Sequence, residues 1–189
     1  LYLFSKDSST PLWTYELGSQ RVIGVAISAD GEYIVAGSKE DNVYLFNKES
    51  STPLWNYSGS ISNLASVTIS SDGEYIVVGD TDTIYLFNKD SSTPVWSSSI
   101  GYTLLLGGLA ISADGEYIVE GDWDQGKVRL FDKDSSTPLW TYSSNDDCND
   151  VMSVSISADG KYIVAGCSSE ANSIHLFDRD SSTPIWTYK

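Results

Sequence analysis

A four-residue tract, Ser-Ser-Thr-Pro, recurs five times along the chain and constrains its fold more than any other feature. Steps of 42, 41, 44 and 46 residues separate the prolines that end it: Pro11, Pro53, Pro94, Pro138 and Pro184. A second marker, Asp-Gly, recurs with steps of 42, 42 and 45 residues, starting at Asp30, Asp72, Asp114 and Asp159. A fixed period in the low forties is typical of repeated supersecondary units that stack on one another.

Each complete unit contains four short segments with strand-like sequence, which we name A, B, C and D. Strand A alternates large and small residues, as in Gly24-Val25-Ala26-Ile27. A Ser-Ala-Asp-Gly tract (Ser-Ser-Asp-Gly in the second unit) joins A to B, and its glycine can adopt the positive φ of a tight turn. Proline precedes strand D, where a missing N–H is tolerated. No window has a convincing helical period.

Four antiparallel strands per unit predict an all-β fold, a β-propeller built from four-stranded antiparallel blades. A stack of β-solenoid coils is the alternative, but it would need shorter repeats and parallel strands. The predicted units are a half blade and four complete blades of one propeller domain. Their boundaries are residues 1–15, 16–57, 58–98, 99–142 and 143–189.

The N-terminal half blade matches strands C and D and has no A and B strands of its own. Either the chain comes from a longer ring of seven or eight blades, or another chain supplies the neighbour. The first residue is Leu1 and not methionine, so we interpret the chain as a piece whose termini are missing. Exposed strand edges invite pairing, and we therefore expect a capacity for self-association through the open blades.

Two stretches carry a family resemblance. Residues 27–38, Ile-Ser-Ala-Asp-Gly-Glu-Tyr-Ile-Val-Ala-Gly-Ser, resemble WD-repeat blades, and residues 130–140, Leu-Phe-Asp-Lys-Asp-Ser-Ser-Thr-Pro-Leu-Trp, are similar to quinoprotein-like (PQQ-like) blades. The resemblance implies a propeller from a prokaryote. The Gly-His and Trp-Asp pairs of WD blades are missing, as at Phe46-Asn47, and so are the cofactor residues of quinone dehydrogenases. We therefore expect no cofactor.

Composition limits the classes of partner. The chain has 26 acidic and 11 basic residues and a net charge of −15. Phosphate neutralisation requires clustered Lys and Arg, so this balance argues against nucleic acid and against an anionic membrane surface. No apolar run approaches the roughly 18 residues of a membrane span, so we expect no membrane insertion.

Strand connectivity places the loops on two faces. The A–B and C–D loops share one face, the repeated face, and are near-identical copies. The D–A and B–C loops share the other, the variable face, and differ in every blade. The D–A loops are 16–21, 58–63, 97–103 and 143–150, and the B–C loops are 39–42, 80–83, 122–127 and 168–173.

Loops on a rigid scaffold usually carry specificity, so the variable face is the predicted recognition surface for a protein or carbohydrate partner. Sequence drift on a surface without a binding role is the alternative. The predicted function is a non-catalytic binding or scaffold propeller. The alternative is a fragment of a larger quinoprotein-like oxidoreductase. One histidine, His175, cannot supply a catalytic triad or a His-rich metal site, and its strand-C position predicts a packed, buried ring.

Trp123 is the tryptophan outside the strand-D set, and an exposed loop Trp can stack on a sugar or anchor a partner. Acidic residues surround it on the variable face and would select cationic or polyhydroxy partners. The candidate binding residues are Trp123, Asp80, Asp82, Asp122, Asp124, Asp146 and Asp147. The densest acids are Glu120, Asp122 and Asp124. They lack the flanking ligands of an EF-hand, so we favour a solvated acidic hairpin tip over a calcium site and predict no metal.

Two pairs of side chains are predicted to interact because of their positions in the repeats. Glu120 and Arg129 replace the usual residues of the same B–C hairpin, and folding it places them opposite each other as an ion pair. Cys148 and Cys167 fall on the variable face of one blade and are candidates for a disulfide. Such a bond would indicate an oxidising compartment, so we expect an extracellular or cell-surface protein.

Overall fold

The computed structural model describes residues 1–59, 61–101, 104–143, 148–168 and 172–189. These residues form 18 β-strands. Within these ranges there is no helix long and apolar enough to cross a bilayer.

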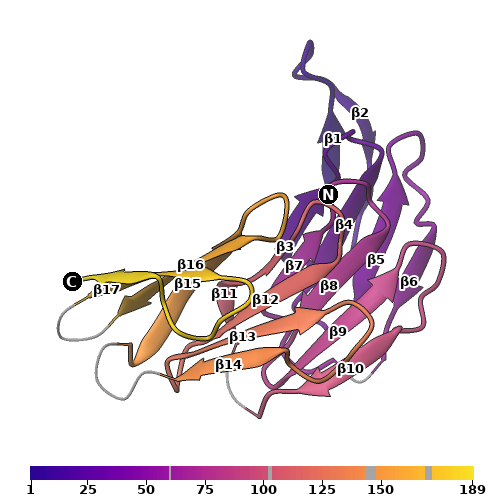
Figure 1. Cartoon of the computed structure of the whole chain (residues 1–189). Coiled ribbons are helices and arrows are strands. Elements are labelled where there is room, and N and C mark those ends of the chain that lie inside the picture. Colours follow the sequence, from indigo (N-terminus) through magenta and orange to yellow (C-terminus); the bar gives the residue numbers. More distant parts are fainter. Residues whose placement is uncertain (60, 102–103, 144–147, 169–171) are drawn as a thin grey trace.

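The strands form one two-stranded and four four-stranded antiparallel sheets, each of which is consecutive along the chain (Figure 1). The N-terminal pair is β1 (Tyr2–Phe4) and β2 (Pro11–Thr14). The first complete blade contains β3 (Val22–Ile27), β4 (Tyr33–Ser38), β5 (Val43–Asn47) and β6 (Trp55–Tyr57). The second contains β7 (Ser66–Ile69), β8 (Tyr75–Gly79), β9 (Thr83–Asn88) and β10 (Trp96–Ser99). The third contains β11 (Leu104–Ile111), β12 (Tyr117–Asp122), β13 (Lys127–Asp132) and β14 (Trp140–Ser143). The last contains β15 (Asp150–Ile156), β16 (Tyr162–Ser168), β17 (Ser173–Asp178) and β18 (Trp186–Tyr188).

This architecture confirms the predicted all-β fold of four blades and an N-terminal half blade. Figure 1 shows the sheets fanned into a curved array, with the β1–β2 pair at the top and the C-terminal blade at the left. Strands A of successive blades pack side by side, β3 on β7, β7 on β11 and β11 on β15. Small residues permit this approach. A Cβ added at Gly24 would lie 3.2 Å from Cγ2 of Val67 in the next blade.

The hydrophobic core lies between blades rather than within them. The strand-C phenylalanine of each complete blade is buried under the strand-D tryptophan of the preceding unit. The four ring pairs, with centroid separations of 5.5, 5.6, 5.9 and 5.5 Å, are Trp13–Phe46, Trp55–Phe87, Trp96–Phe131 and Trp140–Phe177. This explains why the strands are apolar on both faces, because a sheet between two neighbouring units is covered on both sides.

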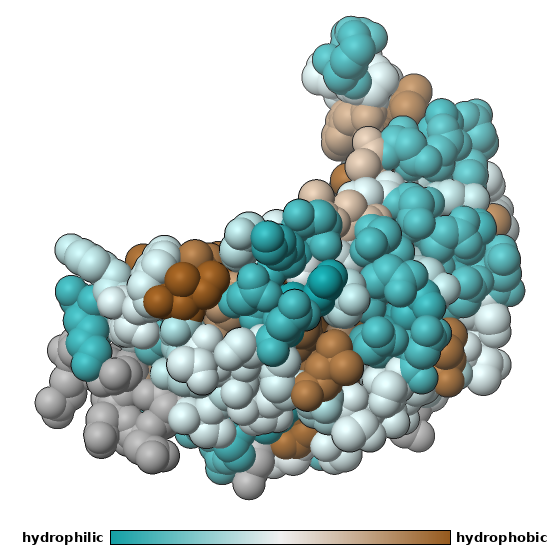
Figure 2. Space-filling model, viewed as in Figure 1, coloured by the Kyte–Doolittle hydropathy of each residue, from teal (hydrophilic) through white to brown (hydrophobic). Residues whose placement is uncertain are grey.

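On the outer side of the last blade, the apolar surface that packs between blades elsewhere is exposed to solvent. Val164, Ile174 and Trp186 are exposed, whereas their equivalents in the first blade, Val35 and Val43, are fully buried. Figure 2 shows hydrophobic side chains over this last blade.

A repeated hydrogen bond also joins neighbouring units. The indole N–H of each of the first four strand-D tryptophans donates to the backbone carbonyl of the basic residue in the next C–D loop. The bonds are 2.7, 2.7, 2.7 and 2.6 Å long and join Trp13 to Lys48, Trp55 to Lys89, Trp96 to Lys133, and Trp140 to Arg179. The indole therefore fixes the angle between two blades as well as filling the space between them.

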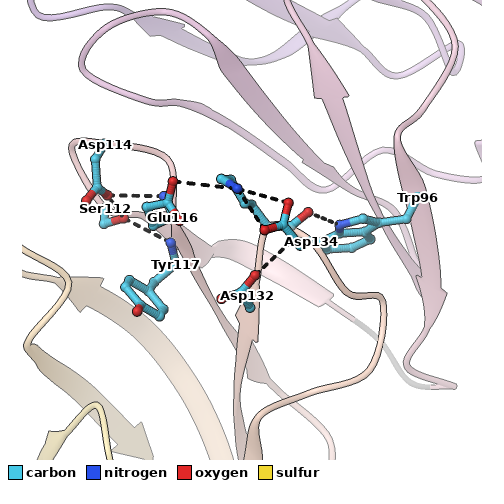
Figure 3. A network of polar contacts seen from close by, with 8 residues as sticks. Trp96, Ser112, Asp114, Glu116, Tyr117, Asp132 and Asp134 are labelled. Carbon is cyan, nitrogen blue, oxygen red and sulfur yellow. Dashed lines mark hydrogen bonds and ion pairs between the residues drawn. The ribbon is translucent and has the colours of Figure 1, made fainter.

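The A–B turn repeats the same local bonds in every blade (Figure 3). In the third blade the Ser112 hydroxyl donates to Asp114 at 2.6 Å and accepts the Tyr117 N–H at 3.0 Å. Asp114 also accepts the Glu116 N–H at 3.1 Å. The Lys133 ammonium lies 3.6 Å from Glu116 and so ties the A–B turn to the C–D loop.

Successive A–B turns are linked to one another along the array. Their backbones hydrogen-bond from Ala29 N to Ser71 O at 2.9 Å and from Ser71 N to Ala113 O at 3.0 Å. The turn glycine also lies against the strand-B tyrosine of the preceding blade, and a Cβ on Gly73 would come within 2.5 Å of the Tyr33 ring. The repeated face is therefore constant because its loops build the contacts between blades.

Candidate functional site

Three of the predicted binding residues are exposed on the variable face. Trp123, in the turn between β12 and β13, is 37% exposed. Asp82 and Asp124, in the B–C turns of the second and third blades, are also exposed. Two other candidates, Asp146 and Asp147, lie outside the described residues. Of the predicted binding residues, Trp123, Asp82 and Asp124 are therefore available to a partner.

Asp80 and Asp122 require a correction, because both are buried, at 1% and 0% exposure. Asp80 Oδ1 accepts the backbone N–H groups of Asp82 and Thr83 at 3.0 and 2.8 Å. Asp80 Oδ2 accepts the Tyr85 hydroxyl at 3.2 Å, and burial raises the pKa of Tyr85 to about 12, with the Asp80 charge adding to the shift. A carboxylate held in this way shapes the hairpin and does not reach a partner.

Asp122 plays the same part in the third blade. Its Oδ1 accepts the N–H groups of Asp124 and Gln125 at 3.0 and 3.1 Å, which closes the B–C turn. Its Oδ2 lies 3.3 Å from Nη2 of Arg129. The expected solvated acidic tip is therefore wrong for Glu120 and Asp122, which have no exposed surface, and holds for Asp124.

Glu120 and Arg129 face each other as ladder partners of β12 and β13. Arg129 Nη1 donates to Glu120 Oε2 at 2.7 Å, and both side chains are buried. The other oxygen, Glu120 Oε1, has no hydrogen-bond partner among the described residues. Burial raises the pKa of Glu120 to about 7, although Arg129 acts in the opposite direction. In the third blade, the two buried carboxyl groups of Glu120 and Asp122 therefore share the guanidinium of Arg129 as their partner.

These residues belong to a series that the sequence alone did not reveal. Each blade has two equivalent buried positions near the variable face, one at or next to the end of strand B and one early in strand C. The pairs are Ser38 with Tyr44, Asp80 with Tyr85, Asp122 with Arg129, and Cys167 with His175. All eight are buried, so the chemistry of this layer changes from blade to blade while the backbone stays the same. Aligning the four units would have shown the series.

The last pair is joined by a third residue. Cys148, in the D–A loop, forms a disulfide with Cys167 across 19 residues, with their Cα atoms 5.0 Å apart. His175 is fully buried beside it, as expected for its strand-C position. Its Nδ1 lies 3.0 Å from the Thr187 hydroxyl and its Nε2 2.9 Å from the Ser173 hydroxyl.

A D–A loop is tied to its B–C loop by different chemistry in different blades. In the first blade the Arg21 N–H donates to Glu40 Oε2 at 3.0 Å. In the second blade the Ser62 N–H donates to Asp80 Oδ2 at 3.0 Å. In the last blade the tie is the disulfide. The described parts of the variable face are therefore fastened by contacts that differ between the first, second and last blades.

Comparison with known families gives one match. A family model described as outer membrane protein assembly factor BamB matches residues 1–122 and 61–189, which together span the chain. The comparison with curated proteins gave no match. The match agrees with the PQQ-like resemblance of the repeats and with the four-stranded antiparallel blades. The chain therefore belongs to the PQQ-like β-propeller family described as outer membrane protein assembly factor BamB.

Proposed function

We propose that the chain is a non-catalytic binding module that holds a protein partner against its variable face. The observation that carries the proposal is that the loops of the two faces make different kinds of contact. Loops of the repeated face are occupied by contacts between blades, such as the bond from Trp55 to the Lys89 carbonyl. Loops of the variable face are fastened individually and leave Trp123, Asp82 and Asp124 at the surface.

The family description supports a protein partner, because it names an assembly factor for outer membrane proteins. The disulfide supports a location outside the reducing cytoplasm, at the cell surface or beyond it. The chemistry of the face supports a cationic segment with an apolar side chain, since an exposed tryptophan is flanked by carboxylates. A glycan that stacks on Trp123 is the competing ligand.

The test compares two triple variants in the intact chain. The first, Trp123→Ala with Asp82→Asn and Asp124→Asn, alters the variable face. The control, Asp90→Asn with Asp134→Asn and Asp180→Asn, removes exposed charges from C–D loops of the repeated face. Affinity is measured for a panel of purified basic and acidic proteins and for a glycan array, at low and high salt.

We expect the variable-face variant to lose more than about tenfold in affinity for basic proteins, since tryptophan anchors dominate interfaces. Added salt should weaken binding of the unaltered chain, because exposed charges are screened. Loss of binding in the control variant instead would show that the repeated face is the recognition surface. Retention of a glycan signal alone would replace the protein partner with a carbohydrate.

The second candidate function, part of a quinoprotein-like oxidoreductase, rests on the similarity of the repeats. It predicts that the chain, given pyrroloquinoline quinone and calcium, binds the quinone and reduces a dye with an alcohol as donor. Our proposal predicts no saturable quinone binding by absorbance titration. Turnover in this assay would overturn the non-catalytic assignment.

Self-association belongs to the same proposal, since the outer side of the last blade has the apolar character of a surface that packs between blades. Sedimentation over a range of protein concentrations tests it. Replacing Ile174 and Trp186 by polar residues should shift the chain toward the monomer, whereas replacement of the exposed Leu54 should not.

A further inference from the structure

Three residues of the last blade differ from their equivalents in the second blade, and together they place two sulfurs and an imidazole in one layer of side chains. Cys148 precedes the strand-A valine Val154 by six residues, the place that Ile61 holds before Val67 in the second blade. Cys167 stands where the second blade has Asp80, and His175 stands where it has Tyr85. A side-chain layer of an aliphatic, a carboxylate and a phenol has thus become two sulfurs and an imidazole.

The three side chains converge. One ligand atom from each of Cys148, Cys167 and His175 lies within 4.8 Å of the other two, and all three residues are buried. The imidazole is oriented from both sides. Nδ1 meets the Thr187 hydroxyl at 3.0 Å, and Nε2 meets the hydroxyl of Ser173, which is the ladder partner of Cys167. Nδ1–H can therefore donate to the Thr187 hydroxyl, which leaves the Nε2 lone pair to accept from Ser173 or to bind a metal ion.

That arrangement matches the requirements of a tetrahedral zinc site. Zinc prefers thiolate and imidazole, at about 2.3 Å to sulfur and about 2.0 Å to nitrogen. A ligating imidazole usually donates its other N–H to an oxygen, as Thr187 provides here. The Ser173 hydroxyl or a water can complete four ligands, and a hollow lined in part by Cys167, Ser173 and Met152 leads to solvent.

We propose that the reduced form of the last blade binds one Zn²⁺ through Cys148, Cys167 and His175, and that the ion and the disulfide are alternative occupants of the same place. A phosphine or dithiol reduces the S–S bond by two electrons and leaves two thiols. Zn²⁺ then binds the two thiolates and releases two protons. The sulfurs must separate to about 3.8 Å for tetrahedral binding, so the S–S bond has to be broken before the ion can bind.

The consequence concerns the variable face. The disulfide or the ion fastens the D–A loop of the last blade to its B–C hairpin, as the Ser62–Asp80 bond does in the second blade. A two-electron oxidant, such as hydrogen peroxide or a small-molecule disulfide, would oxidise the two thiolates to the disulfide and release Zn²⁺. The attachment of Cys148 to strand B of the last blade would then be preserved in either redox state, whereas reduction without metal would release it.

The experiment uses the untagged chain, since a polyhistidine tag binds the same ions. The chain is reduced with a phosphine, desalted without oxygen, and titrated with Co²⁺, whose visible bands report tetrahedral thiolate ligation. Zn²⁺ is then added to displace the cobalt. Circular dichroism follows the fold, and alkylation counts free thiols with and without Zn²⁺.

Two variants restore residues of the second blade and so retain a packed layer. His175→Tyr installs the residue of Tyr85 and keeps both cysteines, and Cys148→Ile installs the residue of Ile61. We expect one equivalent of tetrahedral cobalt in the reduced chain and none in the oxidised chain. His175→Tyr should weaken binding by more than about tenfold, Cys148→Ile should abolish it, and Zn²⁺ should protect both thiols from alkylation.

Absence of tetrahedral cobalt bands in the reduced chain would overturn the proposal. Equal cobalt affinity in the reduced chain and in His175→Tyr would also overturn it, because the cysteines alone would then be the ligands. If reduction unfolds the last blade, recovery of the circular dichroism signal by Zn²⁺ supports the site, and failure to recover it refutes the site.

Discussion

Replacing Arg129 by tyrosine, Glu120 by alanine, or both together tests how the third blade tolerates a buried ion pair. In the first blade the same two ladder positions hold Ala36 and Tyr44. The double variant therefore installs a pair that this fold already accepts. Each single variant instead leaves part of the charged cluster without its partner.

The structure gives the expected magnitudes. Arg129→Tyr leaves Glu120 and Asp122, both fully buried, without a cation, which should cost about 3–5 kcal/mol of unfolding free energy. Glu120→Ala leaves Arg129 with Asp122 alone, at 3.3 Å, and should cost about 2 kcal/mol. The double variant should fall within about 1 kcal/mol of the unaltered chain, because the buried Asp122 would then lie beside a tyrosine hydroxyl, as Asp80 lies beside Tyr85 in the second blade.

Urea unfolding measures the free energy of unfolding of the unaltered chain, the two single variants and the double variant, which together form a double-mutant cycle. The dependence of the free energy on urea concentration must be the same for all four proteins. The coupling between the two sites should be at least about 3 kcal/mol. Additive effects of the two single substitutions would refute the reasoning, since they would mean that the charges do not depend on each other.

The same cluster predicts a pH dependence of stability. The pKa of Glu120 rises from 4.5 to about 7 on folding, so the folded chain binds more protons than the unfolded chain between those values. The stability contributed by the protonated acid is complete below about pH 4.5 and is lost as the pH rises through 7. At about 1.4 kcal/mol per pKa unit the loss is about 3 kcal/mol. Glu120→Gln should remove this slope, and identical pH profiles for the two chains would contradict the assignment.

Three further predictions concern the contacts between blades and the loop tie. Trp55→Phe should lower the unfolding free energy by about 1 kcal/mol through loss of its bond to the Lys89 carbonyl. Trp186→Phe, the control, should change it little, because the Trp186 indole makes no hydrogen bond to the described residues and is 48% exposed. Gly73→Ala should cost about 1–3 kcal/mol more than Gly31→Ala in urea unfolding. Both glycines have a positive φ, but only Gly73 has the Tyr33 ring within 2.5 Å of an added Cβ. Reduction of the Cys148–Cys167 bond should lower the unfolding free energy by about 3 kcal/mol, measured by urea titration with and without a phosphine, and no change would show that the bond does not constrain the loop.

Local chemistry explains why the strands and blades could be predicted. The A–B turn depends on contacts between residues two to five apart, such as Ser112 with Asp114 and Tyr117. Such bonds form wherever the tract occurs, so every copy of the tract predicts the same hairpin. Strand ends were less certain. Strand β7 begins only at Ser66, because the preceding loop packs into the core through Ile61 and Leu64.

The pairing of Glu120 with Arg129 also follows from the sequence, since hairpin geometry alone places those two positions opposite each other. Burial of Asp80 and Asp122 does not follow from it. An acid in a turn is ordinarily exposed, and Asp80 is covered because a loop 18 residues earlier donates the Ser62 N–H to it. Exposure in this fold is decided by the neighbouring loop and the neighbouring blade, which no short window contains.

The sequence by itself determined the repeat, the strand pattern and the two faces, because these arise from turn chemistry and alternation within about ten residues. Only the tertiary structure decided how the blades are fastened. Trp55 and the carbonyl of Lys89 are 34 residues apart, and the Trp140 bond spans 39. The cluster of Cys148, Cys167 and His175 likewise needs a D–A loop, a strand B and a strand C to close on one point. Such contacts depend on the stacking of whole sheets, and that stacking is set by the apolar surface that successive blades bury together.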